Sequence, residues 1–208
     1  MAQYMAVPDG DGRHPAIIVI HEWWGLNDQI RVIADRWAKE GFLAVAPDLY
    51  DGKVVPIGRS EEAAVAMNEL DFPKAVRTIA AAIATLKDDP RCNEKVSVTG
   101  FCMGGALAFA TSAQVKGLAA VVPFYGIPGT ADWSKVDAPV QAHFATRDEW
   151  ATVAKAKEIQ SALGDRMELH VYEAQHAFCN DRRPEVFNPG ACAQAWSRAV
   201  QFVRDHSA

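Results

Sequence analysis

The chain has 208 residues, of which 50% are hydrophobic and 23% are charged, and its formal net charge is −5 at pH 7. This size and composition are typical of one globular domain with a substantial core, so we treat residues 1–208 as a single domain. An acidic chain without a concentrated basic segment lacks the positive surface that attracts nucleic acids and anionic membranes, and we expect neither as a partner.

Short apolar runs alternate with longer amphipathic runs along the chain. In chain order they predict a strand at Ala16–His21, a helix at Asp28–Lys39, a strand at Phe42–Ala46, helices at Ser60–Leu70 and Phe72–Lys87, a strand at Lys95–Thr99, a helix at Cys102–Ser112, strands at Leu118–Phe124 and Val140–Ala145, a helix at Ala151–Leu163, a strand at Met167–Tyr172 and a helix at Ala193–Arg204. Several strands lack polar alternation, which is typical of strands covered on both faces. This order predicts an α/β fold with a mostly parallel central sheet flanked by helices on both faces.

The segment from Gly100 to Gly105 joins a predicted strand to a predicted helix. Its sequence, GFCMGG, has the strand, sharp turn and helix layout of a nucleophile elbow, with Cys102 where a serine is commonest. Glycines let the strand pack closely on the helix, and a helix N-terminus favours the reactive thiolate form of a cysteine. The segment therefore predicts Cys102 as a nucleophile, and the alternative is a small buried cysteine in a glycine-rich turn.

An acid and a histidine follow two later strands, at the edge where an open α/β sheet places its site. Asp148 comes after the strand Val140–Ala145, and His176 comes after the strand Met167–Tyr172. With Cys102 they appear in the order nucleophile, acid, histidine that is expected of an α/β-hydrolase fold. In such a triad the histidine relays protons and the acid orients the imidazole.

Other interpretations of these residues stay open at this point. Asp148 could be a simple helix cap, and Asp137 and Glu149 are competing candidates for the acid. His176 could be a loop histidine bonded to backbone groups. His21 is the other histidine at a strand end, but it precedes the nucleophile in the chain.

Glu22 comes directly after the first apolar strand, between His21 and two tryptophans. A carboxylate is costly to bury without a partner, and if Glu22 faces Cys102, it can accept the thiol proton or hold the thiol neutral until substrate arrives. The alternative is a surface glutamate in a loop. The backbone N–H of Trp23 occupies the position where this fold places one oxyanion donor, and the N–H of Met103 occupies the other.

Four motifs in this order resemble the dienelactone hydrolase family, a branch of the α/β-hydrolases. They are HEWWGLN from His21, APDLY from Ala46, GFCMGG from Gly100 and HAF from His176. The resemblance runs from about Val7 to the C-terminus, and it implies a catalytic triad of Cys102, Asp148 and His176 in which Glu22 helps to activate the thiol. It also implies hydrolysis of dienelactone to maleylacetate without a metal or cofactor.

The sequence departs from this family at the arginines that hold the substrate carboxylate. The stretch after the histidine of the triad reads AFCND, and the nearest arginines are Arg182 and Arg183. A second family arginine falls near Arg59. We expect Arg59, Trp24 and Phe178 to contact the substrate, and a role for Arg182 or Arg183 stays open. The chemistry at the elbow is therefore better supported than the dienelactone substrate.

The leading functional interpretation is a cofactor-independent hydrolase that cleaves a small-molecule lactone or ester through a cysteine acyl-enzyme. One alternative is a thiol esterase of broad scope with a different physiological substrate. Another is a non-catalytic module of the α/β-hydrolase fold that binds a small ligand or a protein. The histidines and cysteines have no close metal-ligand spacing, so we expect no metal site.

Four cysteines lie far apart in the sequence, at Cys92, Cys102, Cys179 and Cys192. They form no dense disulfide framework, so we expect free thiols in a reducing cytoplasm. The sequence shows neither a signal-peptide pattern nor an apolar run long enough to cross a bilayer. We expect a monomer or a weak homodimer, and the role of Cys179 stays open.

Overall fold

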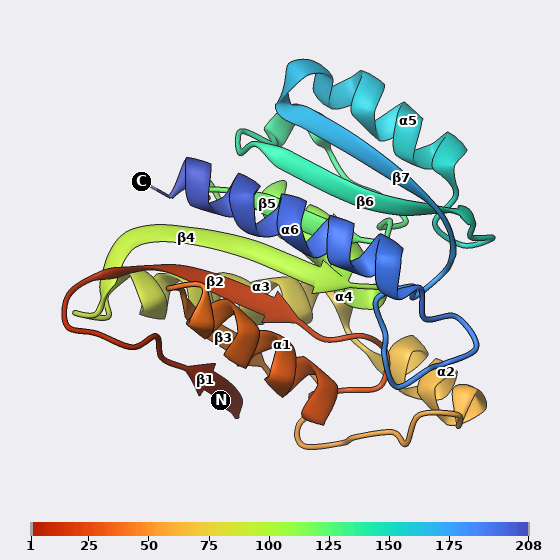
Figure 1. The fold of residues 1–208 in the computed structure, drawn as a ribbon, viewed down its shortest axis with the longest axis horizontal. Helices are drawn as coiled ribbons and strands as arrows, with labels where there is room; N and C mark the ends of the chain where they lie inside the picture. Colours follow the sequence, from red (N-terminus) through yellow and green to blue (C-terminus); the bar gives the residue numbers. More distant parts are fainter. Residues whose placement is uncertain (1, 208) are drawn as a thin grey trace.

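The structure is a computed structural model that describes residues 2–207. Within these residues, seven strands form one sheet in the order β1-β3-β2-β4-β5-β6-β7 (Figure 1). Neighbouring strands are parallel except β1 and β3, which pair antiparallel. The strands are β1 (Gln3–Ala6), β2 (His14–Ile20), β3 (Leu43–Pro47), β4 (Cys92–Phe101), β5 (Val121–Phe124), β6 (Val140–Arg147) and β7 (Met167–Gln175).

Helices cover both faces of the sheet. They are α1 (Asp28–Lys39), α2 (Ser60–Glu69), α3 (Phe72–Lys87), α4 (Met103–Ser112), α5 (Val153–Leu163) and α6 (Pro189–His206), with short 3-10 helices η1 (Trp133–Lys135) and η2 (Gly164–Arg166). Helices α1 and α6 pack on one face, in front of the sheet in Figure 1, and α3, α4 and α5 pack on the other. Helix α2 lies beyond the carboxyl ends of the central strands (Figure 1).

Each face of the sheet buries its own apolar cluster. Beneath α1 and α6, the fully buried ring of Trp37 packs between Phe42 and Trp196, with ring centroids 5.3 Å and 4.8 Å away. On the opposite face, Phe109 of α4 is fully buried among aliphatic side chains of the central strands. Large buried side chains supply most of the favourable energy of such a core, so both layers hold the strands in place.

The α/β class and the mostly parallel sheet predicted from the sequence are confirmed. Helices α1 and α3 begin and end at the predicted residues, because Asn27 and Asp71 cap them by accepting from backbone N–H groups of the first turn. Strand β1 is not predicted by the sequence pattern. It has only four residues and lies at the edge of the sheet, where a short strand shows little periodicity.

The parallel strands end together at one edge of the sheet. Ile20 of β2 pairs with Gly100 of β4, and Phe101 of β4 pairs with Phe124 of β5. The residues that follow these strands therefore emerge side by side. The register of β6 and β7 brings the segments after those strands to the same edge.

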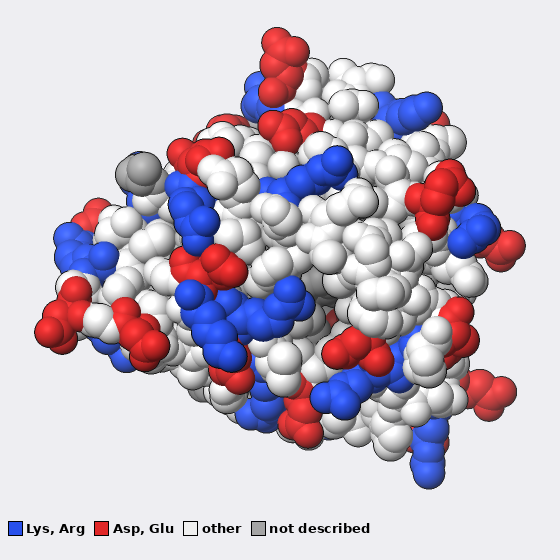
Figure 2. Space-filling model, in the orientation of Figure 1, with Lys and Arg blue, Asp and Glu red and all other residues white. Residues whose placement is uncertain are grey.

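The surface in the view of Figure 1 is mixed in charge. Acidic and basic side chains lie close together across it (Figure 2). No helix among residues 2–207 combines the length and apolar character needed to span a membrane.

Candidate active site

Cys102 stands on the turn between β4 and α4. Its backbone has φ 55° and ψ −118°, in a region that non-glycine residues rarely adopt. The Cys102 N–H donates to the Phe124 carbonyl at 3.0 Å, and the Cys102 carbonyl accepts from Ala106 N–H at 3.1 Å. A Cβ on Gly100 would collide with the Gly104 carbonyl oxygen, so this turn needs glycine to bring strand and helix together. The turn leaves the Cys102 side chain partly exposed.

The side chains of Cys102, His176 and Asp148 form one chain of contacts. His176 Nε2 lies 3.2 Å from Cys102 Sγ, and His176 Nδ1 lies 2.6 Å from Asp148 Oδ2. Asp148 is 6% exposed, and its Oδ1 accepts from the backbone N–H groups of Trp150 and Ala151, both at 2.9 Å. These bonds hold the carboxylate so that it receives Nδ1–H and leaves Nε2 facing the sulfur. A histidine in this geometry can move a proton to and from a nucleophile.

The competing candidates for the acid and the base lie elsewhere. Asp137 forms an exposed ion pair with a lysine at 3.8 Å, and Glu149 is exposed. His21 is fully buried, and its Nδ1–H donates to the Glu22 carbonyl at 2.6 Å while Nε2 accepts from Leu49 N–H at 3.3 Å. Both ring nitrogens of His21 therefore serve the backbone.

The surroundings of His176 favour its charged form. Burial lowers its pKa, but the hydrogen bonds and charges of Asp148 and Cys102 outweigh burial and raise the pKa to about 10. An imidazolium beside the sulfur favours a thiolate, and so does the N-terminus of α4. The pair can therefore supply both a nucleophile and a proton donor.

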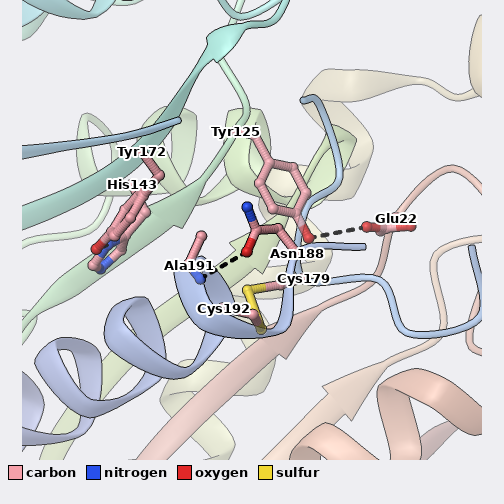
Figure 3. The surroundings of a disulfide bond; sticks show 8 residues. All are labelled: Glu22, Tyr125, His143, Tyr172, Cys179, Asn188, Ala191 and Cys192. Atoms are coloured by element: carbon pink, nitrogen blue, oxygen red, sulfur yellow. Dashed lines mark hydrogen bonds between the residues drawn. A yellow bond between two sulfur atoms is a disulfide. The ribbon is translucent and has the colours of Figure 1, made fainter. Parts of the chain in front are cut away.

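Glu22 is buried, with 2% of its surface exposed. Its Oε1 accepts from the Tyr125 hydroxyl at 3.3 Å, a contact drawn in Figure 3, and its Oε2 accepts from Asn180 Nδ2 at 2.7 Å. Burial raises the pKa of Glu22, against the opposing charge of His176 and these two hydrogen bonds. In this structure both carboxylate oxygens of Glu22 are thus bound by the tyrosine and the asparagine, and a direct role toward the Cys102 thiol stays a prediction.

The turn after β2 is held rigidly around Glu22. The Glu22 carbonyl accepts from His21 Nδ1–H at 2.6 Å and from Gly25 N–H at 3.2 Å. Between these anchors, the N–H of Trp23 donates to no other group within residues 2–207. Met103 is the first residue of α4, and the first N–H groups of a helix have no partner inside it. Neither N–H thus has a backbone acceptor within the described residues, and their role as oxyanion donors stays a prediction.

A cavity of about 550 Å³ opens over the thiol and the imidazole. Its wall is mostly apolar and comes from segments far apart in the chain: Trp23 after β2, Met67 and Leu70 of the α2 region, Tyr125 after β5 and Trp150 after β6. Trp150 is 65% exposed and stands edge-on to the His176 ring, with centroids 5.0 Å apart. This size and lining are typical of a site for a small molecule.

The three side chains predicted to contact substrate do not line this cavity. Trp24 is 1% exposed and packs with Val55 in a small core cluster. Phe178 is fully buried in the cluster beneath α6. The Arg59 side chain is largely exposed before α2 and pairs with Glu62 at 2.9 Å. The predictions for Trp24 and Phe178 are corrected, because their rings fill the core, whereas the role of Arg59, at an exposed position before α2, stays a prediction.

Arg182 and Arg183 also lie outside the cavity wall. Arg183 pairs with Glu185 at 2.8 Å, and Arg182 lies 3.8 Å from Asp181. A role for either arginine in holding a substrate carboxylate stays a prediction, and the charge of Arg183 reaches the buried Glu22.

Three residues of the site are not predicted from the sequence: Tyr125, Trp150 and Asn180. Tyr125 directly follows the strand predicted to end at Phe124, so the same strand-end argument that identifies His176 could have found it. Trp150 and Asn180 lie in loops whose paths leave no periodic signal. Unusual backbone is a further sign, because Tyr125, like Cys102, has a positive φ, of 37°.

Cys179 and Cys192 form a disulfide that joins the loop after the triad histidine to the first turn of α6 (Figure 3). The expectation of four free thiols is therefore wrong for this pair, while Cys92 and Cys102 are free. The sequence does not predict this bond, because the two cysteines are far apart in the chain and only the path of the loop between them brings them together. The role of Cys179 is thus to tie this loop down.

The described residues hold no group of three or more His, Cys, Asp or Glu side chains placed to bind a metal ion. The residues with polar side-chain groups that line the cavity include Cys102, His176, Tyr125 and Asn68. These groups suit acyl-transfer chemistry.

A sequence model of the dienelactone hydrolase family matches residues 1–207. The chain is 34% identical over 217 residues to Protein usf of Aquifex pyrophilus, covering 98% of this chain and 92% of that protein. It is 28% identical over 206 residues to the carboxymethylenebutenolidase of Pseudomonas sp. strain P51, covering 93% and 85% of the two chains. A solved dienelactone hydrolase-like promiscuous phosphotriesterase from metagenomic libraries shares the fold, with a TM-score of 0.83 at 22% identity over 96% of this chain and 89% of that one.

Proposed function

The chain belongs to the dienelactone hydrolase family and is a hydrolase of ester or lactone bonds, and on this basis we propose that it acts through a cysteine acyl-enzyme on Cys102. One observation carries the proposal: contacts of 3.2 Å and 2.6 Å run without a break from Cys102 Sγ through His176 to Asp148. A thiol on a strained turn, beside a partly buried and oriented imidazole at a cavity, meets the geometric needs of acyl transfer.

Acylation begins when Cys102 Sγ attacks the acyl carbonyl carbon. The S–C bond forms while the carbonyl π electrons move onto oxygen, and any thiol proton passes to His176 Nε2. The N–H groups of Trp23 and Met103 donate to the oxyanion. The bond from carbon to the leaving oxygen then breaks, and His176 returns the proton to that oxygen. In a lactone, the leaving oxygen stays attached to the acyl group.

Deacylation uses water as the second nucleophile. The oxygen of the water attacks the thioester carbonyl carbon, and His176 takes a proton from that water. The C–S bond breaks, the proton returns to the sulfur, and a carboxylic acid leaves. Asp148 accepts from Nδ1–H throughout and stabilises the imidazolium in both steps.

Glu22 acts in this scheme as a positioning residue. To take the thiol proton, its carboxylate would first have to break its bonds to Tyr125 and Asn180, at 3.3 Å and 2.7 Å. While these bonds remain, the Glu22 carboxylate holds in position the turn that carries Trp23 N–H. Its contribution is therefore to keep an oxyanion donor at a fixed position.

The direct test combines thiol labelling with turnover of p-nitrophenyl acetate. Iodoacetamide should modify Cys102, abolish turnover and leave Cys92 unmodified, because Cys92 is fully buried. Rapid quenching followed by intact-mass analysis should show an acetyl group on the wild-type chain and none on Cys102→Ala. Unchanged turnover in Cys102→Ala would remove the proposed mechanism, and a non-catalytic binding module would show neither turnover nor an acyl adduct.

A further inference from the structure

We infer that this site takes an uncharged substrate, an ester or lactone whose acyl portion is apolar and carries no carboxylate. The inference rests on the proposed function, since it concerns the substrate held over Cys102. It follows from the side chains of the cavity wall and from the charges around them.

Apolar groups dominate the cavity wall, and no lysine or arginine of residues 2–207 belongs to it. The surfaces facing a bound acyl group include the rings of Trp23, Phe72 and Trp150 and the side chains of Met67 and Ile127. Carboxylate binding in such a site would require partners that replace water, and transfer of an unpaired charge is very costly. The wall therefore favours a hydrocarbon-like acyl group.

Three cations near the cavity lie in neighbouring grooves or at the surface and not in its wall. Arg59 pairs with Glu62 at 2.9 Å, and Lys53 lies 4.0 Å from Glu69 in a separate groove. Lys155 lines another groove, which shares Trp150 with the cavity but lies on the α5 side of that ring. Among the described residues, no lysine or arginine therefore lines the wall next to the thiol, and the charge of Arg183 that acts on the site meets the carboxyl group of Glu22.

The ionisable groups of the site also disfavour a second anion. The imidazolium form of His176 is already matched by the carboxyl group of Asp148 at 2.6 Å, and Cys102 Sγ lies 3.2 Å from the other ring nitrogen. Glu22 adds a buried carboxyl group close enough to His176 for their charges to interact. A carboxylate on the substrate would find the imidazole already paired with Asp148, whereas a neutral acyl group needs no such partner.

The test compares two lactones that differ by one carboxylate: carboxymethylenebutenolide and the same ring without the carboxyl group, 5-methylenefuran-2-one. For the wild-type chain, we expect kcat/KM to be at least about tenfold higher for the uncharged ring, which corresponds to about 1.4 kcal/mol. A preference for the carboxylated lactone would overturn the inference while leaving the acyl-enzyme mechanism standing. Absence of turnover of both rings, with no acyl adduct on Cys102, would instead overturn the proposed function.

A charge introduced into the wall provides the matched variant. Asn68 is exposed on α2 and borders the cavity, so Asn68→Lys should shift the preference toward the carboxylated lactone by about tenfold or more at low salt, and less at high salt. Asn68→Gln should keep the wild-type preference. Arg59→Ala should keep it as well. A selective loss of the carboxylated lactone in Arg59→Ala would show that this arginine binds the anion and would contradict the inference.

Discussion

Asn180 Nδ2 donates a 2.7 Å hydrogen bond to Glu22 Oε2 and so joins the loop after β7 to the turn after β2. Both residues are buried, and they lie 158 positions apart in the chain. The loop that carries the asparagine also follows His176, while the turn that carries Glu22 presents Trp23 N–H. One hydrogen bond therefore couples the position of the proposed base to the position of the proposed oxyanion donor.

Replacing the asparagine tests this coupling. Asn180→Ala leaves a buried carboxylate oxygen without its donor, so we expect a loss of about 1–3 kcal/mol in the free energy of unfolding. If the donor at Trp23 also shifts, kcat should fall by about tenfold or more while KM changes little. Urea unfolding and steady-state kinetics measure the two effects separately. Loss of stability with an unchanged kcat would leave Asn180 a purely structural residue.

The pH profile reports the state of His176. Its pKa is raised to about 10, so the imidazolium that protonates the leaving oxygen persists at neutral pH, and kcat/KM should fall as pH rises through about 10. Asp148→Asn removes one of the bonds that raise this pKa, so the descending limb should move to lower pH. The rate should also fall by up to about 10⁴-fold, because the imidazole loses its orientation. A limb that stays in place would contradict this assignment of the titrating group.

Glu22→Gln should stabilise the chain in a pH-dependent way. Folding raises the pKa of Glu22 above its usual 4.5, so the ionised carboxylate lowers stability once pH exceeds that value, and the effect vanishes below it. The melting temperature of Glu22→Gln should therefore exceed that of the wild type at pH 7–8 and converge with it near pH 4. Glu149→Gln, at an exposed position, is the matched control and should show no such divergence.

The Cys179–Cys192 disulfide should contribute measurably to stability. It closes a loop with a sequence separation of 13, for which the chain-entropy relation gives about 3 kcal/mol. We expect Cys179→Ser combined with Cys192→Ser to lower the free energy of unfolding by roughly that amount in urea titrations. Dithiothreitol should lower the stability of the wild type to the same level and leave the double variant unchanged. Equal stability of all four samples would show that the bond adds nothing.

The three residues of the proposed triad can be predicted from the sequence, because the topology of the sheet determines where each of them lies. Cys102 follows β4, Asp148 follows β6 and His176 follows β7, and parallel strands bring all three to one edge of the sheet. The match to the dienelactone hydrolase family confirms the family resemblance and the hydrolase class that these motifs predict.

The cavity wall is much harder to infer from sequence. Trp23 and Trp24 are adjacent in the chain, yet the first lines the cavity and the second is buried in the core. No periodic pattern decides which of two neighbouring aromatic rings faces solvent in an irregular turn. The partners of Glu22 are equally hidden, because Asn180 reaches it through a loop whose path depends on packing and on a disulfide.

Helix α2 lines the cavity but carries none of the residues Cys102, Asp148 and His176. Only Ala63 and Ala66 of this helix are buried, and no side chain caps its start. The same helix supplies Met67 and Asn68 to the cavity, while every triad member is held by the sheet and its loops. Directed evolution of α2 could therefore change which acyl groups the cavity accepts, one position at a time, without altering the surroundings of the Cys102 sulfur.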